Sequence, residues 1–200
     1  KSKKNNQIII SGYKNNFGGG LLIYSTNEKS TFENVNFSYL NGMKNNQKSF
    51  NNGLIIMGAL NFYKTKTDLI NVNFKKINSE DAINIFRSSF KIENIKFIGN
   101  SSDAIDFDFS NGDISNAFFE NIGNDAIDFS GSKSNVKNIF FKNVNDKLIS
   151  VGENSIINIS DINGNDSFVG IASKDGSVVK ANNIFMKNVK LPFASYNKKL

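Results

Sequence analysis

The sequence contains no histidine, no cysteine and no tryptophan, and Pro192 is its single proline. Without histidine, the chain lacks the commonest general base and metal ligand, and it cannot form a Ser-His or Cys-His nucleophile. The absence of cysteine leaves the redox compartment open, because 200 residues can bury a core without disulfides. No run of 18 apolar residues is present, so the sequence predicts no membrane span.

The charge balance is modest, with 24 Lys and Arg against 18 Asp and Glu and a net charge of +6. Part of the basic excess lies at the two ends, whereas acidic residues gather in the middle, which argues against a phosphate-binding groove. We therefore expect no nucleic-acid partner. The first residues lack a signal-peptide pattern, so we expect an intracellular chain or a trimmed piece of a longer protein.

Internal repeats predict the fold. Three Asp-Ala-Ile triplets begin at Asp81, Asp103 and Asp125, 22 residues apart each time. One apolar column follows this step: Ile83, Ile105, Ile127, Ile149 and Ile171. A second column is made of Asn71, Asn94, Asn116, Asn138, Asn158 and Asn183, and Phe74, Phe97, Phe119 and Phe141 follow three residues after four of them.

Within each repeat the apolar residues alternate with polar ones, as in the stretch from Ile105 to Phe109, which is the period of a β-strand. The sequence therefore predicts an all-β fold, a right-handed parallel β-helix (solenoid) of about seven coils with ~22 residues per coil. We expect a single domain over 1–200, with irregular first coils in 1–57, an inserted loop at 41–52, regular coils over 58–190 and a tail at 191–200. Asn116 and its column mates are expected at an inward-facing, left-handed corner.

Repeats of this length with an Asn column resemble the pectate-lyase-like right-handed β-helix superfamily. The stretch from Gly58 to about Lys199, with its Asp-Ala-Ile-Asp-Phe and Gly-Asn-Asp-Ala-Ile-Asp-Phe-Ser-Gly-Ser segments, is similar to β-helix regions of bacterial surface proteins that also carry a spore-coat-protein-H-like domain. The resemblance implies an extracellular or cell-surface location. It supplies no biochemical role.

Acidic residues form outward columns on the strand that contains Ile105. Asp106 and Asp128 are expected one above the other at the rung spacing of a parallel sheet, with Asp108 beside them. Lys147 and Arg87, at the edges of the same sheet, are the basic candidates to compensate them. By contrast, Asp81, Asp103 and Asp125 precede the strand at a corner and are interpreted as structural acceptors of backbone N–H groups.

Three interpretations of the Asp106, Asp108 and Asp128 cluster remain open: a solvated surface, a Ca²⁺- or glycan-binding site, or catalysis on a polysaccharide. A lyase or epimerase would use Lys147 or Arg87 as base, whereas a glycoside hydrolase would use paired carboxylates. The missing histidine and tryptophan argue against an enzyme, and whether the chain is catalytic stays open. The sequence predicts no cofactor other than this Ca²⁺.

Outward aromatic residues on a neighbouring strand predict an interface at Phe118, Phe140 and Phe185. It is expected to contact a neighbouring domain, a partner chain or sugar rings, and a further partner is expected at the N-terminal end. The favoured function is a surface or secreted β-helix module that binds carbohydrate or acts as a scaffold. The alternatives are a polysaccharide-modifying enzyme and a structural stalk segment of an adhesin or appendage.

Overall fold

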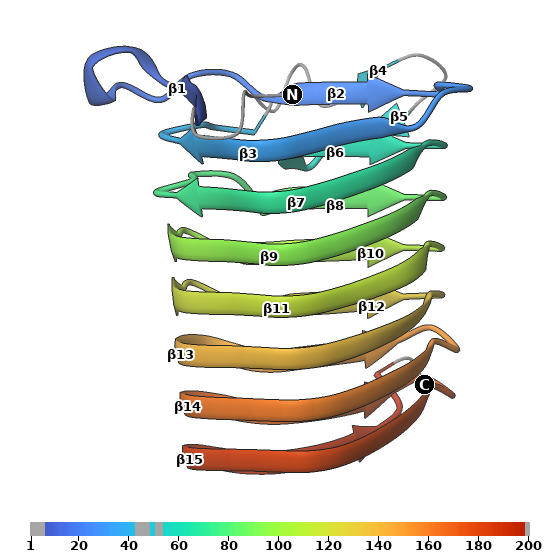
Figure 1. The fold of residues 1–200 in the computed structure, drawn as a ribbon. Coiled ribbons are helices and arrows are strands. Elements are labelled where there is room, and N and C mark those ends of the chain that lie inside the picture. The colour runs from blue at the N-terminus through green and yellow to red at the C-terminus, as the bar shows by residue number, and fades with distance from the viewer. Residues whose placement is uncertain (1–6, 43–48, 51–53, 199–200) are drawn as a thin grey trace.

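The computed structural model describes residues 7–42, 49–50 and 54–198, and its main sheet coils into a parallel β-helix (Figure 1). The early elements are β1 (Ile8–Ser11), a 3-10 turn (Tyr13–Asn15), β2 (Leu21–Tyr24), β3 (Ser30–Ser38), β4 (Ser49–Phe50), β5 (Leu54–Ile55), β6 (Gly58–Tyr63) and β7 (Lys66–Lys75). The later elements are β8 (Asp81–Phe86), β9 (Ser89–Asn100), β10 (Asp103–Asp108), β11 (Asn111–Ile122), β12 (Ile127–Ser130), β13 (Lys133–Gly152), β14 (Ile156–Lys174) and β15 (Val178–Tyr196).

Successive coils pair in parallel along two tracks. On one track β3, β7, β9 and β11 are followed by the first parts of β13, β14 and β15. On the other, β2, β6, β8, β10 and β12 are followed by the last parts of the same three strands. The coils stack from the N-terminal to the C-terminal end of the molecule, as Figure 1 shows.

The chain completes about six turns between its first and last Asn bends, one fewer than the sequence predicted. Most steps are 22 or 23 residues, but Asn34 and Asn71 are 37 residues apart because an insertion lies between them. The predicted loop at 41–52 lies largely outside the described residues, although β4 pairs with β5 in a two-stranded antiparallel sheet there. Residues 191–196, predicted to be a tail, belong to β15 and pair with β14.

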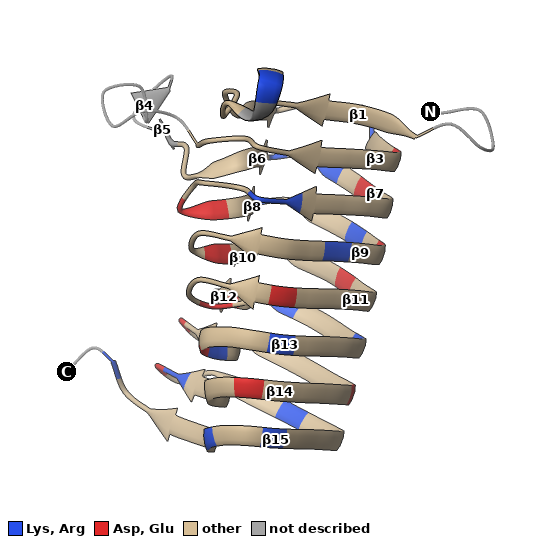
Figure 2. Ribbon diagram, turned by 90° about the vertical axis from the view of Figure 1, so that its left-hand side faces the viewer, with Lys and Arg blue, Asp and Glu red and all other residues tan. Residues whose placement is uncertain are grey.

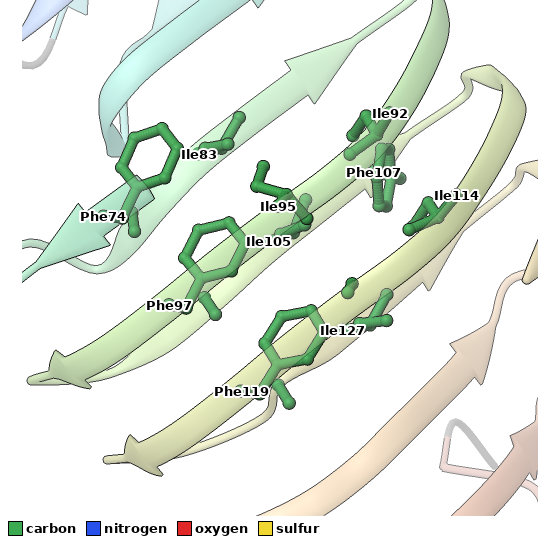
Figure 3. Close-up of a cluster of buried hydrophobic side chains, with 14 of the residues drawn as sticks. Phe74, Ile83, Ile92, Ile95, Phe97, Ile105, Phe107, Ile114, Phe119 and Ile127 are labelled. Atoms are coloured by element: carbon green, nitrogen blue, oxygen red, sulfur yellow. The ribbon is translucent and has the colours of Figure 1, made fainter. Parts of the chain in front are cut away.

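The predicted apolar columns form the core (Figure 3). Ile105, Ile127 and Ile149 are buried at equivalent positions of successive coils. Phe119 is fully buried, and its ring stacks on those of Phe97 and Phe141, with centroids 5.1 Å away on each side. Both columns are confirmed.

The Asn column lies at a left-handed bend as predicted, but its side chains point outward. Seven residues with φ between 53° and 59° share this bend: Asn34, Asn71, Asn94, Asn116, Asn138, Asp161 and Asn183. Their side chains form an exposed ladder in which, for example, Asn138 Nδ2 donates to Asn116 Oδ1 at 2.6 Å. The predicted inward orientation is wrong because the bend turns the side chain away from the core.

Asn158 does not belong to this column. It pairs with Asn135, and Asp161 takes the bend position of its coil, accepting a bond from Asn183 Nδ2 at 3.0 Å. Asn158 lies only 20 residues after Asn138, whereas the bends at Asn138 and Asp161 are 23 residues apart, so Asn158 falls three positions before the bend.

We expect Asn116→Ala to lower the free energy of unfolding by about 1–2 kcal/mol, because an ordinary side chain at positive φ is strained. Asn116→Gly relieves the strain and removes only the exposed amide bond, so its effect should be smaller. Urea denaturation of both variants measures the difference. Equal losses would mean that the ladder hydrogen bond, and not the backbone conformation, stabilises the bend.

A buried serine ladder closes another corner. The hydroxyls of Ser88, Ser110, Ser132, Ser155 and Ser177 each accept the backbone N–H of the residue at the equivalent corner of the preceding coil, at 2.9–3.1 Å. Ser110 and Ser132 are completely buried, and their hydroxyls lie within hydrogen-bond distance of backbone carbonyls. This ladder satisfies buried backbone groups where the chain turns.

Candidate functional site: an acidic face on successive coils

The outward side chains of β8, β10 and β12, together with the coil positions that precede these strands, form a surface that we call the acidic face. Ile105 and Phe107 point into the core. Asp106 lies between them in the strand and Asp108 follows Phe107, so both Asp side chains point outward. The register places Asp128 directly beside Asp106, as the sequence predicted. Figure 2 shows acidic residues recurring on consecutive coils near the start of β8, β10 and β12.

Asp106 and Asp108 share one hydrogen-bond donor, the side-chain amide of Asn84. Asn84, one coil earlier, donates its Nδ2 to Asp106 Oδ2 at 3.1 Å and to Asp108 Oδ2 at 3.2 Å. One amide therefore serves two carboxyl groups, and the cluster has more acceptors than donors.

Burial raises the pKa of Asp106 well above its usual range, and the charges of Asp81, Asp108, Asp128 and Asp103 raise it further. The pKa of Asp108 is also raised by burial, although the hydrogen bond from Asn84 opposes the shift. These directions follow from like charges held close together away from water, which favours the protonated forms.

Two carboxylate oxygens of this face have no hydrogen-bond donor among the described residues. Asp81 is 3% exposed, and its Oδ2 is buried without a partner. Burial, followed by the charge of Asp103, raises the pKa of Asp81 well above normal. Asp128 Oδ1 is likewise buried without a hydrogen bond, although the Lys174 ammonium lies 3.8 Å away.

Asp103 and Asp125 have the structural role that the sequence predicted. Asp103 Oδ1 accepts the backbone N–H of Asp125 at 2.9 Å, and Asp125 Oδ1 accepts that of Lys147 at 3.0 Å. Burial raises the pKa of Asp125 to about 6, against the opposing effect of Lys147. Each carboxylate thus links its coil to the next.

The two basic candidates lie elsewhere than expected. The Lys147 ammonium contacts Asp125, at 3.3 Å, and Asp146, at 2.5 Å, on the corner column. The Arg87 guanidinium lies over the Phe86 ring, 5.3 Å from its centroid, at a bend with φ of 48°. Among the described residues, neither forms an ion pair or a hydrogen bond with Asp106 or Asp108, so the prediction that they compensate these carboxylates gains no support.

Lys174 is the residue that the sequence prediction missed. It is 7% exposed, and its Nζ donates to Ser150 Oγ at 2.6 Å while approaching Asp128 Oδ1. Its position on the same outward column as Asp108 and Ser130 was visible in the repeat. What the repeat did not reveal is that its side chain reaches back across one coil to Asp128.

Stacked aromatic rings border the acidic face on its N-terminal side. Tyr24, Tyr63 and Phe86 occupy one outward column, with ring centroids 5.2 and 5.3 Å apart, and Asp108 follows them in the same column. Phe109, which is 50% exposed, packs edge-on against Phe86. The acidic face therefore has several carboxylates and an aromatic border on its N-terminal side.

The predicted aromatic interface lies on the other track. Phe118 and Phe140 stack in parallel with centroids 5.3 Å apart, and the Lys96 ammonium lies 4.7 Å from the Phe118 centroid. Phe185 shares their column but is separated from Phe140 by Asn163, so the three do not form one continuous patch. The role of this surface as an interface stays a prediction.

The described residues contain no group of three or more Asp and Glu side chains placed to hold a metal ion. The calcium hypothesis therefore gains no support from the geometry. Within the same residues, no helix has the length and apolar character needed to cross a membrane.

No protein-family model matches this chain, and no curated protein matches it. Two solved structures with some similarity are both of PfbA, described as a surface adhesin of Streptococcus pneumoniae. Each is 11% identical; the first match covers 96% of this chain and 85% of that chain with a TM-score of 0.16, and the second covers 92% and 77% with a TM-score of 0.17. Similarity at this level supports no inference, so the class rests on the strand pairing: the chain is a parallel β-helix.

Proposed function

We propose that this chain is a β-helical module of a cell-surface or secreted protein and that it binds a glycan along the acidic face. The observation that carries the proposal is the surplus of hydrogen-bond acceptors on an outward surface. Asp81 Oδ2 and Asp128 Oδ1 lack donors within the described part of the chain, and one Asn84 amide serves both Asp106 and Asp108. The two unpaired oxygens are themselves buried, whereas Asp106 and Asp108 are half-buried and share one amide donor, so a ligand that brings donors would complete their hydrogen bonding.

A glycan supplies what this face lacks. Its hydroxyl groups donate hydrogen bonds to carboxylates, and its ring C–H groups pack against apolar side chains such as the edges of Tyr63 and Phe86. In a row of fully solvated Asp residues, the carboxyls would stay in contact with water. Burial is instead the main cause of the raised pKa of Asp106 and of Asp108. Asn61, Asn84, Asp106 and Asp128 occupy one outward column on successive coils, so polar side chains run along the axis and suit an extended ligand.

Binding is tested by calorimetric titration with neutral hexose tetrasaccharides. We expect Asp108→Ala to weaken binding at least about tenfold, or ~1.4 kcal/mol, because it removes a half-buried acceptor. The matched control is Asp113→Ala on β11, where an exposed carboxylate accepts one bond from Asn135 at 2.8 Å. No binding by the wild type, or equal affinity in the Asp108 variant, would overturn the proposal and leave the scaffold or stalk hypothesis.

The neighbouring carboxyls of Asp106, Asp108 and Asp128 favour polysaccharide hydrolysis as a second candidate function. Burial raises the pKa of Asp106, which suits a general acid, and Asp128 on the next coil provides a second carboxylate. Lys147, which the sequence predicted as the base of a lyase or epimerase, forms ion pairs with Asp125 and Asp146. Release of reducing ends by the wild type, lost in Asp106→Asn, would support hydrolysis; intact oligosaccharide after long incubation would exclude it for that substrate.

A further inference from the structure

We propose that Lys174 and Asp128 form an intramolecular isopeptide bond, an amide between Lys174 Nζ and the Asp128 side-chain carbonyl carbon. The two residues lie two coils apart, on β14 and β12. Both strands pair with β13, so the bond crosses the intervening coil and ties three coils together. The inference is independent of glycan binding, because it concerns a reaction within the chain.

Lys174 is a buried lysine at the end of an outward strand. It is 7% exposed, although lysine side chains are rarely buried unless their charge is paired. Its strand neighbour Ser173 pairs with Val151, which places Lys174 beside Gly152. The side chain lies against this glycine, since a Cβ built on Gly152 would be 3.4 Å from Lys174 Cε. The ammonium group thereby extends back past the preceding coil.

The Lys174 ammonium and the Asp128 carboxyl are neighbours without a hydrogen bond between them. Lys174 Nζ is 3.8 Å from Asp128 Oδ1, whereas charge-assisted N–H···O bonds are about 2.7–2.9 Å long. Among the described residues, Asp128 Oδ1 is buried and has no hydrogen-bond partner. A buried ion pair is stabilising only when good geometry offsets the desolvation of both charges. An amide bond removes both charges and so accounts for the arrangement.

Lys147 shows how a structural lysine is held in the same stack. Its Nζ lies 2.5 Å from Asp146 Oδ2, and 3.3 and 3.4 Å from the two carboxylate oxygens of Asp125. Hydrogen bonds to two carboxylates therefore compensate the charge of Lys147. The printed distances give Lys174 a hydrogen bond to a neutral hydroxyl and only the longer approach to Asp128.

Ser150 provides a path for the proton. It is completely buried, and it pairs with Asp128 on the neighbouring coil. Its Oγ accepts a hydrogen bond from Lys174 Nζ at 2.6 Å. Because a hydroxyl group both accepts and donates, Ser150 can take a proton from the ammonium as it gives its own to the Asp128 carboxylate.

The reaction is a condensation that releases one water molecule. Proton transfer through Ser150 converts the ammonium and the carboxylate to an amine and a carboxylic acid. The lone pair of Lys174 Nζ attacks Asp128 Cγ, and the C–N bond forms while a C–O bond breaks. The departing hydroxyl takes a proton from the nitrogen and leaves as water. Fixed neighbours in a buried site react as an intramolecular pair, which favours this step.

Intact-mass spectrometry of the denatured chain tests the proposal. We expect the wild-type chain to be lighter than its sequence mass by one water molecule. Proteolysis should release a branched peptide that joins the segments around Asp128 and Lys174, and trypsin should not cleave after Lys174. The full sequence mass after long incubation of the folded protein would overturn the proposal. A lighter chain without the branched peptide would overturn it as well, because the water would then come from another site.

Three variants assign the reacting groups. Lys174→Arg and Asp128→Ala each remove one of them, so each variant should have its full sequence mass. Ser150→Ala removes the proton path and should leave a large fraction of the chain unlinked. The matched control is Lys147→Arg, which changes the other ion-paired lysine and should keep the loss of one water. A branched peptide that persists in Lys174→Arg would overturn the assignment.

The outcome is distinguishable from that of the glycan titration. The bond leaves Asp106 and Asp108 unchanged, so its absence would overturn this inference and leave glycan binding standing. Failure to bind a glycan would equally leave the isopeptide bond standing. A bond formed at Asp128 would remove the carboxylate that the hydrolysis hypothesis assigns to this residue, and would exclude hydrolysis by that carboxylate.

Discussion

Replacing Phe119 with Ala should lower the free energy of unfolding by about 3–5 kcal/mol. The Phe119 ring is fully buried between Phe97 and Phe141, with centroids 5.1 Å away on both sides. The substitution removes the buried area and two stacked ring contacts, and it leaves a cavity in the middle of a column that cannot collapse without moving both neighbouring coils. Guanidinium unfolding followed by circular dichroism gives the measurement.

Phe140→Ala is the matched control. Phe140 also stacks on a ring of the neighbouring coil, Phe118, but it is 37% exposed. Its removal should therefore cost about 1 kcal/mol or less. Similar losses for the two variants would contradict the assignment of Phe119 to the core wall and Phe140 to the outer surface.

The inward columns could be predicted from the sequence because burial constrains residue type at every coil. Ile105, Ile127 and Phe119 recur at a fixed step since each must fill the same space in the stack. The outward positions obey no such constraint. The sequence predicted the positions of Asp106 and Asp128 on the acidic face because these residues alternate with core residues in their strands.

The errors have physical causes. Asp adopts a left-handed bend as Asn does, and Asp161 occupies the bend predicted for Asn158. The pattern of apolar residues is the same for either assignment, so it could not show the error. The side-chain direction at the bend was also missed, because an exposed amide ladder and an inward one share the same sequence pattern.

Side-chain reach was a further limit. Lys147 was expected to compensate the outward Asp residues, but it pairs with Asp125 and Asp146. Lys174 instead extends back past the preceding coil toward Asp128. Long flexible side chains choose partners by three-dimensional reach, which repeat spacing alone does not determine. The serine ladder at Ser88, Ser110 and Ser132 was different: its spacing of 22 residues was present in the sequence and could have been recognised.

Asp106→Asn should raise the free energy of unfolding at neutral pH by about 1–3 kcal/mol, because it removes a buried like charge without changing the shape of the side chain. Burial and the charges of Asp81, Asp108, Asp128 and Asp103 raise the pKa of Asp106 in the folded protein. The folded state therefore holds the proton more tightly than the unfolded state. This contribution to stability is complete below the pKa of the unfolded chain and is lost as the pH rises through the folded-state pKa.

The gain from Asp106→Asn should consequently shrink as the pH falls. The other raised carboxyls act in the same direction: the pKa of Asp125 is raised to about 6, so its share is lost between the ordinary Asp range and about pH 6. Thermal unfolding of wild type and variant at acidic and neutral pH measures the change, with Asp113→Asn as a control that should alter stability by less than about 0.5 kcal/mol at both. Destabilisation by Asp106→Asn at neutral pH would mean that the carboxylate stabilises the coil. The acidic face would then have a structural explanation, and ligand binding would no longer be needed to explain its cost in stability.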